Sequence, residues 1–233
     1  MSKKPFVLLA ALATLSLSSA APSKSPSAPV FDPAHFVAGV NNPYFPLPVG
    51  RTWVYEGVKD GVTQVDTVTV TSMTKVILGV NATVVSDVAT HEGTILEKTF
   101  DWYGQDTDGN VWYLGEDTSA FGKNGKIDKS GSWEAGVNGA EPGIVMEAHP
   151  AIPDAYRQEF LAGDAEDTAW VVEVGGTASV PYGKVRNTLV TLEATALEPG
   201  AYDQKIYAPG IGMILERALT GTPEFAQLVS VTP

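Results

Sequence analysis

The segment VTQVDTVTVTSM, residues 62–73, decides the fold class of this chain. Apolar and polar residues alternate along it, with Val68 and Val70 set between threonines. A period of two is typical of a β-strand rather than of a helix. An Asp60-Gly61 pair, which favours a tight turn, and an aromatic, β-branched run at 52–56 precede the segment. Together these features predict a β-hairpin.

The same sequence pattern continues along the chain. Short β-like runs separated by glycine-containing turns are typical of an antiparallel meander. Before a glycine-rich loop at 117–143, which holds one short strand at Trp133, strands are expected at 82–90, 94–103 and 110–116. After it, strands are expected at 156–162, 168–174, 185–196, 205–207, 213–219 and 225–231. The predicted fold class is all-β and mainly antiparallel, a large curved sheet that is half-barrel or barrel-like, with little helix.

Two segments leave room for alternatives. PDAYRQEF, residues 153–160, fits a helix capped by Asp154 or a strand with Tyr156, Gln158 and Phe160 on one face, and we favour the strand. The proline-rich segment NNPYFPLPVG, residues 41–50, is excluded from regular helix and from a central strand. We expect it to be extended and to cover a sheet edge.

The first residues predict export. Lys3 and Lys4 precede a short apolar run at 6–17, and small residues lead to a plausible cleavage point after Ala20. An uncleaved membrane anchor is the alternative, but the run is shorter than the roughly 20 apolar residues that span a bilayer. We therefore expect a signal peptide at 1–20, a flexible linker at 21–30 and a single β-rich domain at 31–233. The absence of cysteine excludes disulfides and a lipid anchor on cysteine.

The charge restricts the partners. The formal charge is −12, and it becomes −14 once the two leader lysines are removed. A field of this sign repels nucleic acid and anionic membrane surfaces. The expected location is secreted or periplasmic, with no nucleic-acid partner and no stable membrane anchor after cleavage.

Familiar catalytic motifs are missing. The chain has three histidines and neither an HExxH nor a GxSxG motif. Zinc enzymes and Ser-His-Asp hydrolases need histidines with organised neighbours. No catalytic residue is assigned.

A metal site is one interpretation of DWYGQDTDGNVWYLGE, residues 101–116. Asp106, Asp108 and Asn110 alternate and could bring three oxygens to a calcium ion, although the glycine and glutamate spacing of an EF-hand is absent. The alternative is a hairpin turn in which Asp-Gly-Asn supplies a left-handed residue.

Aromatic pairs suggest a ligand cavity. In Trp102-Tyr103 and Trp112-Tyr113, neighbouring rings point to opposite faces of a strand, so each face receives aromatic surface. The second face is either a few exposed rings or the wall of an apolar cavity. In YRQEF, Arg157 and Glu159 share a strand face and form a surface pair or, if that face lines a cavity, Arg157 binds an anion. The candidate ligand-binding residues are Trp102, Trp112, Tyr113, Tyr156, Arg157 and Glu159.

Five ordered strings carry a resemblance: NNPYFPLPVGRTWVYEG (41–57), DWYGQDTDGNVWYLGE (101–116), SWEAGVNGAEPGIVM (132–146), YRQEFLAGDAED (156–167) and KIYAPGIGMILE (205–216). Over residues 31–216 the chain resembles a family of uncharacterised secreted bacterial proteins, which has no established activity to carry over. The stretch 207–214 is also similar to a late strand of half-barrel envelope proteins of the lipid-carrier type. That likeness implies a curved sheet around an apolar cavity.

The leading hypothesis is a non-enzymatic extracytoplasmic protein that binds an apolar or amphipathic ligand, such as a lipid, on a concave sheet face. One alternative is a hydrolase of envelope or extracellular polymers that acts through carboxylates such as Asp101, Asp106 or Glu159. Another is a calcium-stabilised structural or adhesion module.

Overall fold

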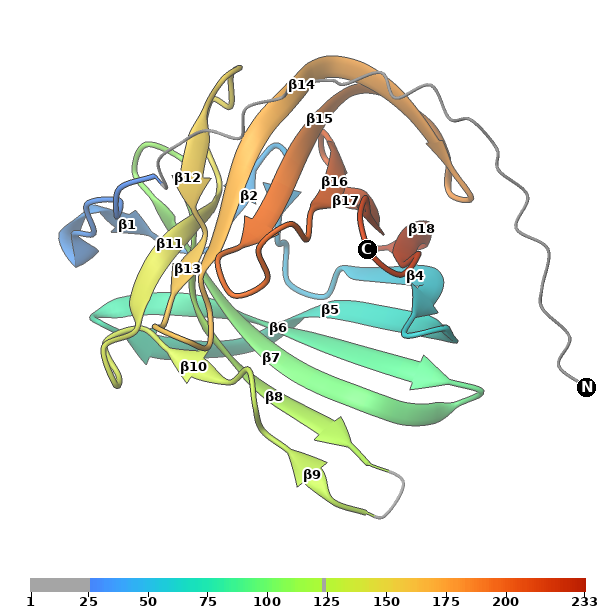
Figure 1. The fold of residues 1–233 in the computed structure, drawn as a ribbon. Helices are drawn as coiled ribbons and strands as arrows, with labels where there is room; N and C mark the ends of the chain where they lie inside the picture. The colour runs from blue at the N-terminus through green and yellow to red at the C-terminus, as the bar shows by residue number, and fades with distance from the viewer. Residues whose placement is uncertain (1–25, 123–124) are drawn as a thin grey trace, which may run out of the picture.

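Nearly all regular structure in the chain is β-strand (Figure 1). The computed structural model describes residues 26–122 and 125–233. The expected signal peptide, 1–20, and the first half of the expected linker, 21–25, lie outside the described residues. Within the described part, the one helical element is the 3₁₀ turn η1, Pro33–His35. That part also contains no helix long and apolar enough to cross a bilayer.

One antiparallel sheet dominates. Its main path runs β12-β14-β15-β16-β17-β18-β4-β5-β6-β7-β8-β11-β13. In chain order the strands of this path are β4 (Thr52–Lys59), β5 (Val62–Ile77), β6 (Val80–His91), β7 (Thr94–Asp106), β8 (Val111–Phe121), β11 (Glu141–Met146), β12 (Ala155–Arg157), β13 (Glu159–Phe160), β14 (Asp167–Val180), β15 (Gly183–Thr195), β16 (Asp203–Ala208), β17 (Gly212–Ala218) and β18 (Phe225–Thr232). The shorter strands are β1 (Phe36–Val37), β2 (Asn41–Asn42), β3 (Phe45–Pro46), β9 (Ile127–Asp128) and β10 (Trp133–Glu134). The all-β, antiparallel prediction is confirmed.

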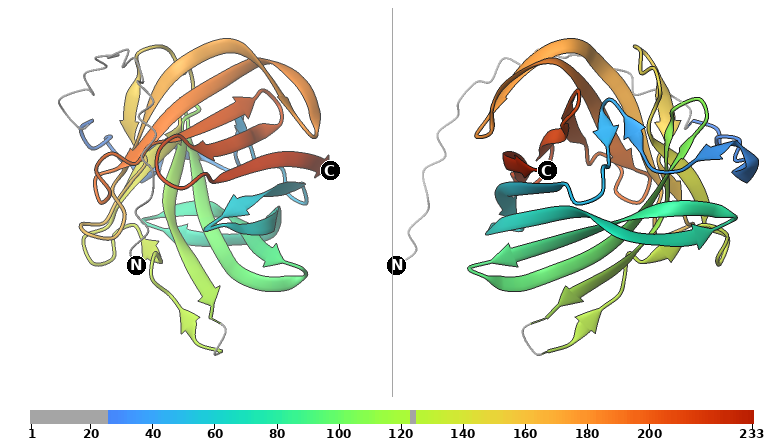
Figure 2. Two further views of the ribbon diagram at one scale, coloured as in Figure 1. Left: turned by 45° about the vertical axis from the view of Figure 1, so that its right-hand side comes forward. Right: turned by 180° about the vertical axis from the view of Figure 1, so that it is seen from behind.

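The sheet curls into a barrel that is nearly closed (Figure 2). The two ends of its path, β12 and β13, are consecutive in the chain and separated by Gln158 alone. The backbone N–H of Gln158 donates to the carbonyl of Asp167 in β14 at 2.8 Å. We call the unsealed line between these end strands the seam.

The loop expected at 117–143 contains more strand than predicted. Its short strand at Trp133 is present as β10, but β11 begins at Glu141, inside the expected loop. The sequence does not indicate this strand, because it contains Pro142 and Gly143, and both residue types are rare in sheets. Gly143 is required by close approach, since a Cβ there would lie 2.4 Å from the carbonyl oxygen of Arg157.

The proline-rich segment lies across one end of the barrel rather than along a sheet edge. Its strands β2 and β3 pair only with each other. Val40 and Leu47 are buried in the interior cluster. The Gln105 side chain accepts from the backbone N–H groups of Asn41 and Asn42 at 2.7 and 2.9 Å. The segment therefore caps the barrel.

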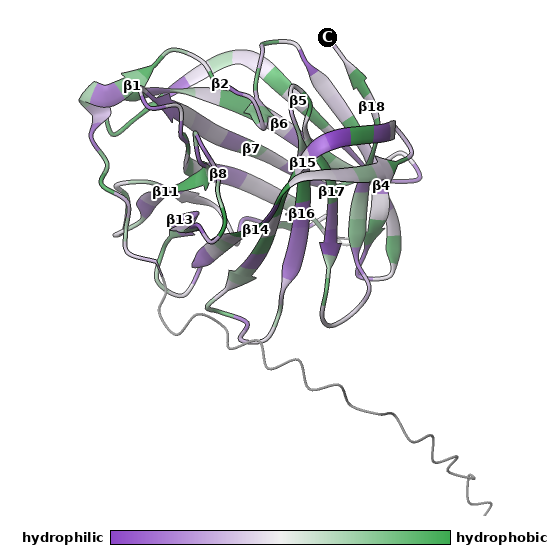
Figure 3. Cartoon of the chain, turned by 90° about the horizontal axis from the view of Figure 1, so that it is seen from above, coloured by the Kyte–Doolittle hydropathy of each residue, from purple (hydrophilic) through white to green (hydrophobic). Residues whose placement is uncertain are grey.

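Apolar and polar residues alternate along the strands (Figure 3), and both faces of β6–β8 are covered. Val85 belongs to the interior cluster, whereas its neighbour Val84 belongs to a second cluster on the outer face. The rings of Phe31 and Phe36 cover that outer face and lie 5.4 and 5.8 Å from Trp112.

Candidate ligand-binding site

The inner face of the barrel changes from apolar to acidic along its length. In β5 the inward positions run from Val70 and Val68 to Asp66, because alternate residues of a strand share one face. The same change runs along three other strands: Val85 to Asp87 in β6, Leu189 to Glu193 in β15 and Tyr207 to Asp203 in β16. The strand registers bring these acidic ends to one end of the barrel, opposite the cap.

A pocket of about 360 Å³ opens at this acidic end. It lies near the ends of β4 and β6 and the beginning of β16. We call it the mouth pocket. Its charged and polar lining consists of Lys59, Gln64, Asp66, Asp87, Glu97, Thr99, Asp203, Glu216, Arg217 and Glu224. Val58, Ala89, Ala218, Phe225 and Ala226 add apolar surface. The lining of the pocket is thus acidic on one part and apolar on another.

The lining carries an excess of negative charge. It holds six carboxyl groups and two basic side chains, so its formal charge is −4 when all groups are ionised. A unit charge 4 Å from an opposite one gains about 1 kcal/mol in water and about 4 kcal/mol near a protein surface. A cation is therefore attracted to the mouth, and an anion is repelled.

Lys205 balances part of this charge deeper in the barrel. Its Nζ lies 2.8 Å from Oε2 of Glu193 and 3.6 Å from Oε1 of Glu216. Burial acts to lower the pKa of Lys205, but these carboxylates outweigh it and hold the pKa well above its usual value. The side chain keeps 25% exposure although it points inward, so side chains do not fill the acidic end completely.

Several inner carboxyl groups hold their protons unusually tightly. Burial raises the pKa of Asp101 to about 7, against the hydrogen bond that the Tyr113 hydroxyl donates to it at 2.7 Å. Burial, reinforced by Asp101, raises the pKa of Asp87 well above its usual value. Burial also raises the pKa of Asp66 and of Asp203. A bound cation would favour the ionised forms and release protons.

A second acidic pair lies at the seam. Burial, with repulsion from Asp167, raises the pKa of Glu159 to about 8. Burial likewise raises the pKa of Asp167, against hydrogen bonds from Thr195 and Glu159. Glu159 is in β13 and Asp167 in β14, so the two acidic groups lie on opposite sides of the seam.

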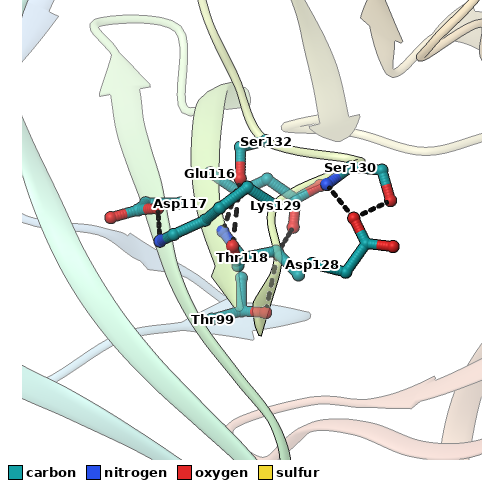
Figure 4. A network of polar contacts seen from close by, with 8 residues as sticks. All are labelled: Thr99, Glu116, Asp117, Thr118, Asp128, Lys129, Ser130 and Ser132. Carbon is teal, nitrogen blue, oxygen red and sulfur yellow. Dashed lines mark hydrogen bonds and ion pairs between the residues drawn. The ribbon is translucent and has the colours of Figure 1, made fainter. Parts of the chain in front are cut away.

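A polar network stiffens the β7–β8 wall of the barrel (Figure 4). Thr99, which lines the mouth pocket, shares a hydrogen bond of 2.8 Å with Thr118. The Thr118 hydroxyl donates to Glu116 at 2.7 Å. The Thr118 backbone N–H donates to the Ser132 hydroxyl at 2.9 Å, which ties the following loop to β8.

The two candidate tryptophans lie away from the mouth. Trp102 and Trp112 are 6% and 3% exposed in the outer cluster, and neither lines the mouth pocket. Tyr103 packs against the interior cluster, which matches the expected split of the Trp102-Tyr103 pair between two faces. Tyr113 stacks on Tyr103 at 5.0 Å between ring centroids.

The side chains of the remaining three candidates have different surroundings. Tyr156 is buried in the interior cluster. Arg157 and Glu159 do not share one strand face, because Arg157 ends β12, which pairs with β14, whereas Glu159 begins β13, which pairs with β11. Arg157 donates to Glu141 at 2.6 Å on the outer side, whereas Glu159 faces Asp167.

The candidate metal residues form a turn. Oδ1 of Asp106 accepts from the backbone N–H groups of Gly109 and Asn110, and Oδ2 accepts from the side chains of Asn110 and Trp112, all at 2.8–2.9 Å. Gly109 has the positive φ of a left-handed turn residue, at 100°. Asn110 Oδ1 accepts from the Ala148 N–H at 2.8 Å. Across the described residues, no group of three or more histidines and acids is arranged to hold a metal ion.

The residues that line the mouth were not among the sequence candidates. Asp66 could have been found from the sequence. It occupies the same alternating positions as Val68 and Val70, so it interrupts an otherwise apolar strand face. Asp203 and Glu216 could not have been found in this way. They lie near Asp66 and Asp87 only because β18 pairs with β4.

Comparison with known proteins finds two similar solved structures. One is a candidate lipoprotein from Parabacteroides distasonis, with 11% identity, a TM-score of 0.46 and coverage of 81% of this chain and 98% of that one. The other is a candidate exported protein with a YmcC-like fold from Bacteroides fragilis, with 13% identity, a TM-score of 0.49 and coverage of 82% and 99%. No family model and no curated protein matches the chain. The family resemblance in the sequence stays a prediction.

Proposed function

We propose that this protein is a non-enzymatic, extracytoplasmic binding protein that takes an amphipathic ligand with a cationic group at the mouth of its barrel. The observation that carries the proposal is the acidic mouth pocket, where six carboxyl groups and two basic side chains border apolar surface from Val58 and Phe225. Its volume of about 360 Å³ lies at the small end of ligand-sized pockets.

The acidic lining refines the expected ligand. A purely apolar molecule would have to displace water from several carboxyl groups without replacing their hydrogen bonds, which is costly. A cationic head satisfies these groups, while a short apolar part contacts the alanines and Phe225. An anionic lipid meets the repulsion of the same carboxylates.

Two detergents test the charge preference. Dodecyltrimethylammonium and dodecyl sulfate share one alkyl chain and carry opposite charges. Isothermal titration below their micellar concentrations should show the cation binding at least tenfold more tightly. The preference should shrink in high salt, because exposed charges are screened. Equal affinity, or tighter binding of the sulfate, would contradict the proposal.

A matched pair of variants locates the binding. Glu97→Gln removes one carboxylate from the mouth pocket and should weaken the cationic detergent by about fivefold, the equivalent of ~1 kcal/mol for one partly solvated charge pair. Glu198→Gln makes the same change on an exposed turn outside the lining and should leave affinity unchanged. Equal effects of the two variants would place binding elsewhere.

The natural ligand can be identified in protein that is purified from the organism that makes it. Native mass spectrometry of protein purified from its own envelope should show a bound cationic amphiphile, and solvent extraction should release it. Protein that is recovered empty under conditions that preserve non-covalent complexes would argue against ligand binding.

A carboxylate hydrolase is the second candidate, because Asp101 and Glu159 keep their protons near neutral pH, as general acids do. Neither lines the mouth pocket, and both carboxylate oxygens of Asp106 already accept hydrogen bonds from its own turn and from Trp112. Turnover of a glycan or peptide polymer that is abolished by Asp101→Asn and by Glu159→Gln would establish the hydrolase instead.

A further inference from the structure

A second pocket, of about 280 Å³, lies on the outer face of the barrel beside the seam. We call it the seam pocket. Tyr156 and Ala169 are paired and point inward, so their neighbours Arg157, Thr168 and Trp170 point outward. The walls around these outward residues are Pro26, Phe160, Glu166, Ala194, Thr195 and Ala196.

Two hydrogen-bond donors of the pocket lack acceptors. Nε of Arg157 and Nε1 of Trp170 are buried, and neither has a hydrogen-bond partner within residues 26–122 and 125–233. Buried N–H groups in folded proteins nearly always have a partner, because an unpaired one costs about 1–3 kcal/mol. Two such donors on residues of one pocket indicate a missing acceptor.

The donors are held in place. Nη2 of Arg157 donates to Glu141 at 2.6 Å, and the guanidinium lies 5.0 Å from the centroid of the Phe160 ring. The pairing of β12 with β14 places Trp170 two positions along the strand from Thr168, the partner of Arg157. Both side chains are therefore held in one orientation before a ligand arrives.

The charges select a neutral acceptor. Glu141 neutralises Arg157, and Glu166, which accepts from the Gly163 N–H at 2.8 Å, brings another negative charge to the lining. An anion therefore gains little from Arg157, whereas a carbonyl oxygen can accept from the free N–H groups without repulsion. The apolar walls suit a ring, and Pro26 already lies against them.

We propose that the seam pocket is a second binding site, which takes an extended, proline-containing peptide whose backbone carbonyl accepts hydrogen bonds from Arg157 and Trp170. Aromatic-lined grooves bind such peptides because the extended proline conformation loses little entropy on binding. The site is independent of the mouth pocket, since the two share no lining residue.

Nitrogen-15 NMR of the full chain tests the proposal with N-acetylproline amide as the probe. The indole N–H signal of Trp170, identified with Trp170→Phe, should shift saturably. The signal of Trp53 should not move, because its indole already donates to Ile211 at 2.7 Å. Arg157→Lys keeps the charge but removes Nε, and should weaken the probe three- to tenfold. Arg186→Lys, on an exposed part of β15 outside the pocket, should leave affinity unchanged.

Three results would overturn the proposal. The first is a Trp170 signal that does not move at the highest soluble probe concentration, which would mean that water alone satisfies the donors. The second is an affinity that Arg157→Lys leaves equal to that of Arg186→Lys. The third is tighter binding of benzoate than of N-acetylproline amide, which would make the pocket an anion site.

Discussion

Replacing Lys205 with methionine should destabilise the barrel strongly at neutral pH. The change keeps most of the apolar stem but removes the ammonium that lies 2.8 Å from Glu193 and 3.6 Å from Glu216. Breaking a fully buried pair costs about 3–5 kcal/mol, because the remaining charge is uncompensated. Since Lys205 keeps a quarter of its exposure, we expect about 2–4 kcal/mol. This is a fall of roughly 4–16 °C in melting temperature for a domain of this size.

A matched control identifies the cause. Thermal melts of wild type, Lys205→Met and the exposed-site control Lys184→Met at pH 8 measure the loss. A variant within about 2 °C of the control, a shift of well under the expected 2 kcal/mol, would refute the reasoning.

Three further predictions follow from the interior and the turns. A raised carboxyl pKa gives stability that is complete below about pH 4 and is lost as pH rises through the folded-state value near 7, so Asp101→Asn should flatten the fall in melting temperature between pH 5 and pH 8. Calcium or a chelator should leave the melting temperature unchanged, because Asp106 is saturated by four donors, whereas Asp106→Ala should cost at least ~2 kcal/mol in denaturant unfolding. Gly143→Ala should cost at least ~1–3 kcal/mol, because its Cβ meets the Arg157 carbonyl, and an unchanged denaturation midpoint would show that β11 can move aside.

The strand architecture was predictable because its signal is local. Alternation over 62–73 and the Asp60-Gly61 turn anticipate the hairpin of β4 and β5. The short β11 was not predictable, since Pro142 and Gly143 act against a strand and only the packing between β8 and β13 makes one.

The site was harder to predict than the sheet. Alternation shows that two faces differ, but it does not show which face is inside. Trp102 was expected to line a cavity, yet residues such as Phe36 cover its face from outside and make a second core. The inner face instead carries acids such as Asp87, a placement that only the closed barrel explains.

The pairing of β18 with β4 has a consequence for how the chain matures. Thr232 lies opposite Thr52, so a strand that is synthesised long after β4 completes the ladder of β4. Until β18 arrives, β4 presents an open edge, and open edges recruit other strands. Contacts of such high sequence separation also form slowly. The pairing of β18 with β4 is thus the stage at which a folding chain is most exposed to aggregation, and chaperone protection would be most valuable there.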